Sequence, residues 1–119
     1  MTTMDSLKTI LDKMNTQLGA TGSAVVSKNG IMMASKLPPE AREETFGLLA
    51  ATIFGASEVA YTELGKGVPL KVVVESEQGR MIVANAGAKA VLVITGLRSP
   101  VPDENSILTD SLAAIKGAI

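Results

Sequence analysis

The sequence predicts an α+β domain built as a three-layer α/β/α sandwich, with helices on both faces of a five-stranded antiparallel sheet. Apolar residues recur at helical spacing in three segments. Five apolar runs lie between them, in a group of two and a group of three, and within each group the turns are too short for a parallel crossover. One run, Val91 to Ile94, is apolar without alternation, which is typical of a strand covered on both faces. The expected order is α-β-β-α-β-β-β-α in a single domain, residues 1–119.

Amphipathic helices are expected at both ends of this order. In the first helix, Thr3 is the expected N-cap and Gly19 the expected stop. In the last, Asp103 follows a proline-bounded loop and is expected to cap the helix. Apolar positions three and four residues apart define the two stripes: Met4, Leu7, Leu11, Met14 and Leu18 in the first helix, and Leu108, Leu112, Ile115 and Ile119 in the last.

The five apolar runs are expected to form a hairpin and a meander. Residues 23–27 and 31–36 flank Asn29-Gly30, and Asn-Gly between apolar runs is a strong hairpin signal because both residues tolerate a positive φ. Pro38-Pro39 ends the second strand. The last three runs, joined by short glycine-containing turns, are expected to form the meander: residues 70–76, 80–86 and 90–97.

The central helix, expected over Phe46–Leu64, is apolar on nearly every side. Its uninterrupted apolar segment ends at Ala51, whereas a membrane-spanning helix needs about 20 consecutive apolar residues, so we expect a buried helix. The positions expected to face the sheet are Phe46, Leu49, Ala50, Ile53, Ala60 and Leu64, with Phe54 and Tyr61 at the flank.

A second stripe on this helix carries small residues at four-residue spacing: Gly47, Ala51 and Gly55. Glycine inside a helix costs about 0.8 to 1 kcal/mol relative to alanine, which indicates a compensating close approach of another backbone. Two interpretations remain open. The ridge pairs with a second helix across a dimer, or the glycines fit a tight place against the chain's own sheet.

Composition excludes several classes of function. The net charge of -1 and the scattered Lys and Arg residues supply no surface for nucleic acid. The chain has no cysteine and no histidine, which excludes disulfides, the usual zinc sites and the commonest general base. No P-loop motif is present, and the adjacent carboxylates, such as Asp103-Glu104, are expected on solvated faces. We therefore expect no enzyme, no cofactor and no metal, and the polar start without a signal pattern predicts a cytoplasmic protein.

Three segments resemble the roadblock/dynein light-chain family, and the resemblance covers almost the whole chain. They are the glycine-rich start and hairpin (residues 19–38), the alanine-rich central helix with its glycine loop (48–67), and the meander with Gly79 and Gly87 in its turns (70–94). The fold that the resemblance implies is roadblock-like and profilin-like. The family usually has a glycine where the last helix begins, and this chain has Asn105-Ser106 there.

The resemblance implies a homodimer, or a heterodimer with a paralogue, that acts as a platform or regulator for a small Ras-like GTPase. Third strands would pair across the two-fold axis, central helices would lie side by side, and the GTPase would rest on them. The expected dimer interface is Lys71, Val73 and Glu75 with Gly47, Ala51 and Gly55. The expected partner-binding patch is Leu48, Thr52, Glu58, Val59 and Thr62.

Two alternatives accompany this hypothesis. A small-ligand-sensing module of GAF-like or PAS-like architecture would need an internal pocket, for which three aromatic residues offer little. Arg42, at the start of the central helix, is the arginine best placed to stabilise a GTPase transition state, although a solvated arginine beside Glu40 or Glu43 is the simpler interpretation.

Overall fold

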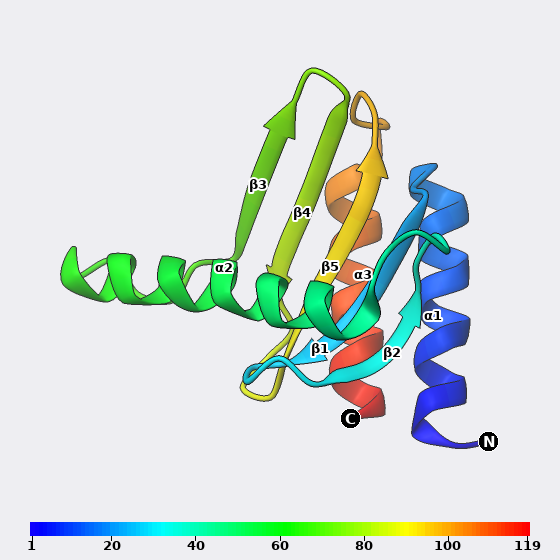
Figure 1. Ribbon diagram of the computed structural model, residues 1–119, viewed down its shortest axis with the longest axis horizontal. Coiled ribbons are helices and arrows are strands. Elements are labelled where there is room, and N and C mark those ends of the chain that lie inside the picture. The colour runs from blue at the N-terminus through cyan, green and yellow to red at the C-terminus, as the bar shows by residue number, and fades with distance from the viewer.

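The computed structural model describes all of the residues, Met1–Ile119, and confirms the predicted element order (Figure 1). The helices and strands are α1 (Thr3–Leu18), β1 (Gly22–Ser27), β2 (Met32–Lys36), α2 (Glu43–Glu63), β3 (Lys71–Ser76), β4 (Gly79–Asn85), β5 (Ala90–Leu97) and α3 (Glu104–Ala118).

The sheet has the strand order β2-β1-β5-β4-β3, and every neighbouring pair is antiparallel. The strand that contains the non-alternating run, β5, lies at the centre, as predicted. Its residues Val91 to Ile94 are fully buried because helices cover both faces of the sheet. The order leaves β2 and β3 as the two edge strands.

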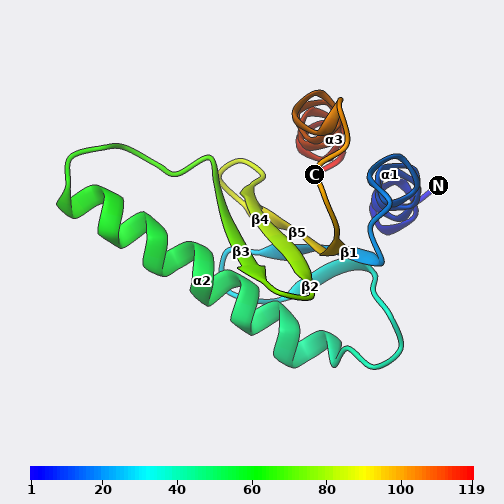
Figure 2. The same cartoon turned by 90° about the horizontal axis from the view of Figure 1, so that it is seen from above.

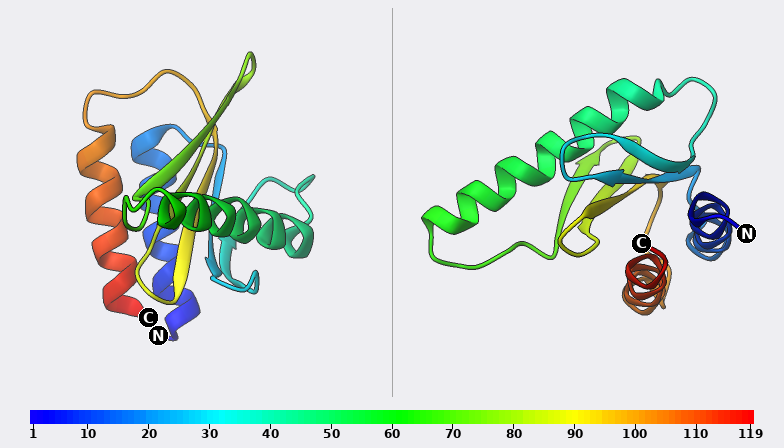
Figure 3. Two further views of the ribbon diagram at one scale, coloured as in Figure 1. Left: turned by 90° about the vertical axis from the view of Figure 1, so that its left-hand side faces the viewer. Right: turned by 90° about the horizontal axis from the view of Figure 1, so that it is seen from below.

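The three layers are plain in Figure 2, where α2 crosses one face of the sheet and α1 and α3 lie on the other. Alternate residues of each strand feed two separate apolar clusters. Val83 and Val93 pack with Phe54 of α2, whereas Ile82 and Leu92 pack with the α1 and α3 side chains. The two views of Figure 3 show α1 and α3 side by side on their face. The sandwich architecture is therefore confirmed.

The helix caps differ from the expectations in detail. The N-cap of α1 is Thr2, one residue before the predicted Thr3, and Thr2 forms a reciprocal capping box with Asp5. Gly19 ends α1 in the left-handed conformation, as predicted. Asp103 holds the N-cap position of α3, but its side chain makes no capping hydrogen bond, so that prediction was wrong about the mechanism.

The sheet-facing stripe of α2 is rotated relative to the prediction. Its fully buried positions are Gly47, Ala50 and Phe54, so Phe54 is the centre of the contact and not its flank. Phe46 and Ile53 are half-buried as partners of this stripe. The prediction was wrong for three positions, which are exposed: Leu49, Ala60 and Leu64.

The reason for part of this error is that α2 is longer than the sheet is wide. Figure 1 shows its C-terminal half projecting past β3, the edge strand, with no strand beneath it. Sequence periodicity describes which side of a helix is apolar, but it does not tell where the underlying sheet ends. None of the helices is long and apolar enough to cross a lipid bilayer.

Candidate interaction surface

The edge strand β3 exposes most of its side chains, including Val73 and Val74. Its hydrogen bonds to β4 show which backbone groups are free. Asn85 N donates to Leu70 O over 2.9 Å, and the ladder continues in the register of Lys71 with Ala84. In an antiparallel pair every second residue turns its N–H and C=O toward the neighbour. Residues 70, 72, 74 and 76 therefore bond to β4, whereas residues 71, 73 and 75 turn theirs to the open edge.

The other edge strand, β2, is protected in ways that β3 is not. It is five residues long, and its pairing with β1 is interrupted by a register shift between Val25 and Val26. Lys36 ends it, and Pro38 follows, whose missing N–H cannot join a ladder. Irregularity, charge and proline are devices by which edge strands avoid pairing. Of the two edge strands, only β3 pairs with its neighbour without a register shift, so it offers the regular edge.

The small-residue ridge of α2 behaves differently at its two glycines. A Cβ added at Gly47 would lie 3.0 Å from Gly30 O and 3.5 Å from a Val26 methyl group. Gly47 therefore leaves room for the turn between β1 and β2, which supports the second interpretation at this residue, a tight place within the chain. Gly55 has nothing within 4 Å of its added Cβ, and Ala51 is half-buried.

The flank of α2 opposite the ridge is exposed and apolar. Leu49 is 55% exposed and Leu64 66%. Ala60 lies on the same flank and lines a hollow of about 620 Å³ between the overhanging helix and β3, together with Tyr61 and Val72. The ridge flank faces the turns between β1 and β2 and between β4 and β5, so this opposite flank faces the middle of β3 (Figure 1).

Four of the five residues predicted to bind a partner are exposed on α2. Leu48 and Val59 are 57% and 65% exposed. The hydroxyl groups of Thr52 and Thr62 donate to carbonyl groups one turn earlier, Leu48 O and Glu58 O, over 2.7 and 2.9 Å. Since these hydroxyl groups are satisfied within the helix, the patch is more apolar than its sequence suggests.

The fifth residue, Glu58, is half-buried and lines a different hollow, beneath α2. Lys28 lies in the same hollow, with its Nζ 4.5 Å from the centre of the Phe54 ring and donating to Asn85 Oδ1 over 2.8 Å. The sequence contained no signal for this arrangement, because Lys28 belongs to the hairpin turn and Phe54 to the helix. Glu58 thus stands at the inner border of the patch.

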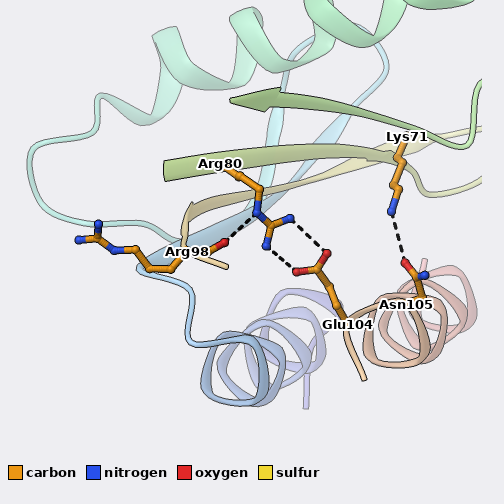
Figure 4. Close-up of polar contacts among 5 residues, drawn as sticks. All are labelled: Lys71, Arg80, Arg98, Glu104 and Asn105. Carbon is orange, nitrogen blue, oxygen red and sulfur yellow. Dashed lines mark hydrogen bonds and ion pairs between the residues drawn. The ribbon is translucent and has the colours of Figure 1, made fainter. Parts of the chain in front are cut away.

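The arginines have different environments. Arg42 is exposed at the N-cap position of α2 and makes no capping hydrogen bond. Arg80 Nη1 and Nη2 donate to the two carboxylate oxygens of Glu104 over 3.2 and 2.6 Å, and Arg80 Nε donates to Arg98 O over 2.7 Å (Figure 4). The hydrogen bond to Glu104 raises the pKa of Arg80.

Glu104 was expected on a solvated face, and that prediction was wrong. The side chains of Arg80 and Glu104 are only 13% and 12% exposed. The pair fastens the first turn of α3 to β4, so neither residue is available to a partner. No group of three or more acidic, His or Cys side chains could hold a metal ion.

The fold has counterparts among known proteins. The Roadblock/LC7 domain model matches residues 7–95. The uncharacterized protein MJ0310 of Methanocaldococcus jannaschii is 35% identical over 86 residues, which are 72% of this chain and 75% of that protein.

Two solved structures show the same fold. Myxococcus xanthus MglB superposes with a TM-score of 0.88 at 14% identity, covering 96% of this chain and 87% of that chain. A structure described as MglB with a tetrameric arrangement gives 0.85 at 18% identity, covering 98% and 89%. With the family model spanning most of the sequence, the chain belongs to the Roadblock/LC7 domain family.

Proposed function

We propose that two copies of this protein pair through β3 and that the joined α2 helices bind a small Ras-like GTPase. The observation that carries the proposal is the combination of an unprotected β3 edge with an α2 helix that projects beyond it. A second sheet added at β3 would continue beneath the projecting half of α2. The apolar residues that the single chain leaves exposed there would then be covered.

The free backbone groups select one register for this pairing. A two-fold axis at Val73 sets Val73 opposite its own copy and Lys71 opposite Glu75 of the partner subunit, so residues 71, 73 and 75 all form ladder hydrogen bonds. An axis at Val72 would set Glu75 opposite Pro69 of the partner subunit, which has no N–H. An axis at Val74 would set Lys71 against the turn after β3. The first register also pairs opposite charges twice.

The same axis decides which flank of α2 meets its copy. The ridge of α2 faces the turns between β1 and β2 and between β4 and β5, which lie on the far side of the helix from the two-fold axis at Val73 (Figure 1). The two helices would therefore face each other through the opposite flank, which carries Leu49, Ile53 and Ala60. This flank replaces the ridge of Gly47, Ala51 and Gly55 as the expected helix contact.

Charge reversal tests the register. Lys71→Glu or Glu75→Lys sets like charges opposite each other at two symmetric places, and each should weaken dimerisation about tenfold. The double variant Lys71→Glu/Glu75→Lys should restore it. Lys89→Glu, in the turn between β4 and β5, is the matched control. Sedimentation equilibrium would measure the dissociation constants, and a native chain that stays monomeric at micromolar concentration would refute the dimer.

The GTPase assignment is supported by membership of the family and by the surface of α2. In the dimer, the outward residues Leu48, Thr52 and Val59 would form an uncharged patch repeated about the axis. Contiguous apolar surface of this kind marks partner sites. If the GTPase contacts the dimer through a surface that differs between its GDP and GTP states, the dimer would bind the two states with different affinities. Only such a difference in affinity couples binding to the nucleotide state.

Titrating the dimer with a small Ras-like GTPase from the same genome, loaded with GDP or with a non-hydrolysable GTP analogue, tests the function. Thr52→Arg and Val59→Arg should each weaken binding at least about tenfold while the dimer persists. These variants are cleaner than Glu58→Lys, which would also set a second cation beside Lys28. Equal binding by the variants would exclude this surface, and no binding in either nucleotide state would exclude the function.

A further inference from the structure

A second groove lies on the face of the sheet away from α2, between α3 and the start of β3. It has a volume of about 620 Å³, a size typical of small-molecule sites. Its lining comes from the two strand ends and from one side of α3: Leu70, Lys71, Asn85, Asn105, Leu108, Thr109, Leu112, Ala113 and Lys116. The outward patch of α2 contributes nothing to it, but Lys71 belongs both to this groove and to the β3 edge at which the dimer is proposed.

The middle of the groove is apolar and elongated. Leu108 and Leu112 lie on α3, one turn apart, and Leu70, 84% exposed, lies at the edge that this groove shares with the hollow between α2 and β3. Along α3 the lining extends from Asn105 to Lys116, which is about 16 Å at 1.5 Å per residue. The shape suits an extended hydrocarbon chain.

Its charged groups are all cationic. Lys71 and Lys116 line the groove, and no Asp or Glu does. Glu104, which precedes the lining residue Asn105 on α3, already forms an ion pair with Arg80. Asn105 accepts a hydrogen bond from Lys71 Nζ over 3.4 Å through Oδ1, so its amide nitrogen remains a free donor (Figure 4). A group with acceptor oxygens and negative charge complements this lining.

Lys116 is the better of the two cations for such a group. Its side chain passes over Gly87, where an added Cβ would meet Lys116 Cγ at 3.5 Å and Cε at 3.8 Å. Lys71 has an acceptor in Asn105, whereas Lys116 forms neither an ion pair nor a side-chain hydrogen bond. Its ammonium group therefore has no partner within the chain, and its donors are unused.

We propose that this groove binds a free single-chain carboxylate of the fatty-acid type, with the hydrocarbon chain along Leu108 and Leu112 and the carboxylate at Lys116. Dodecanoate, titrated below its critical micelle concentration into the full chain labelled with ¹⁵N, is the probe. Amide shifts should concentrate on α3 and the start of β3. Dodecyltrimethylammonium, with the same chain and the opposite charge, should bind at least about tenfold more weakly.

Two variants and their matched controls locate the site. Ala113→Phe should fill the groove and abolish the shifts, whereas Ala114→Phe, on the exposed outer side of the same helix, should not. Lys116→Glu should weaken binding about tenfold, and Lys13→Glu on α1 should leave it unchanged. Circular dichroism confirms that each variant is folded.

The remaining outcomes overturn the proposal. No binding of dodecanoate would exclude the site, and equal binding of the cationic amphiphile would reduce it to unspecific apolar adsorption. Shifts that map to α2, or that persist in Ala113→Phe, would move the ligand elsewhere. If the protein bound anionic phospholipid vesicles but not dodecanoate, the ligand of this groove would be a membrane surface and not a free fatty acid.

Discussion

The guanidinium group of Arg80 lies against the carboxylate of Glu104 in a two-pronged ion pair that joins β4 to the first turn of α3. Both side chains are largely buried. The residues are 24 apart in the chain, with most of β4, all of β5 and the loop after β5 between them. This pair is the main polar link between α3 and strand β4.

Removing one member of this pair should be costly. Arg80→Ala leaves a buried carboxylate without its partner and should lower the free energy of unfolding by about 3 kcal/mol. The double variant Arg80→Leu/Glu104→Leu removes both charges and should lose less. Urea denaturation of the single and double variants measures the difference. If both lose the same amount, the charge pairing has no specific role.

Two glycines should respond in opposite ways to alanine. Gly96 has a φ of +68°, and an added Cβ would come within 2.6 Å of Thr21 Cβ, so Gly96→Ala should destabilise the fold by about 2 kcal/mol or more. Gly55 lies inside α2 with open space around it, so Gly55→Ala should stabilise by about 0.5 to 1 kcal/mol. Thermal unfolding would measure both.

The Gly55 variant also tests the orientation of the α2 pair. If the helices meet through the flank with Ala60, Gly55→Ala leaves the dimer intact, and Ala60→Arg disrupts it. If the ridge makes the contact, Gly55→Ala weakens the dimer and Ala51→Leu abolishes it. Sedimentation equilibrium of these three variants distinguishes the flanks, with Ala114→Leu on the exposed outer side of α3 as the control for a bulkier side chain.

The start of α1 should depend on pH through Asp5. Its backbone hydrogen bond from Thr2 lowers the pKa of Asp5 below 3.8, and its own N–H donates to Thr2 Oγ1 over 3.1 Å. Because the pKa of Asp5 is lowered in the folded state, its carboxylate stabilises the fold fully above pH 3.8, the ordinary pKa of the group. This stabilisation is lost as the pH falls through the folded-state pKa.

Asp5→Asn should therefore reduce stability near neutral pH and should remove part of the acid dependence. Measuring the midpoint of urea unfolding between pH 2 and 6 for both proteins would show it. The curves should converge at low pH, where the native carboxyl group is protonated. A constant offset between them at every pH would show that the effect of Asp5 does not come from its charge.

The sequence by itself determined the element order, the hairpin and the central strand. These depend on local signals: Asn29-Gly30 permits a tight turn, Pro38-Pro39 ends a strand, and Val91 to Ile94 admit no polar face. The exposure of Leu48 and Val59 was also predicted, because neither falls on the stripe expected to face the sheet.

Tertiary structure alone decided the rest. Which flank of α2 lies on the sheet depends on how the helix crosses the strands, and an apolar helix carries little periodic signal to indicate it. The same holds for Gly47, whose neighbour Gly30 comes from a distant turn, and for Glu104, whose partner Arg80 lies on another strand. Such contacts join residues far apart in the chain, so they depend on the packing of whole elements and not on any local pattern.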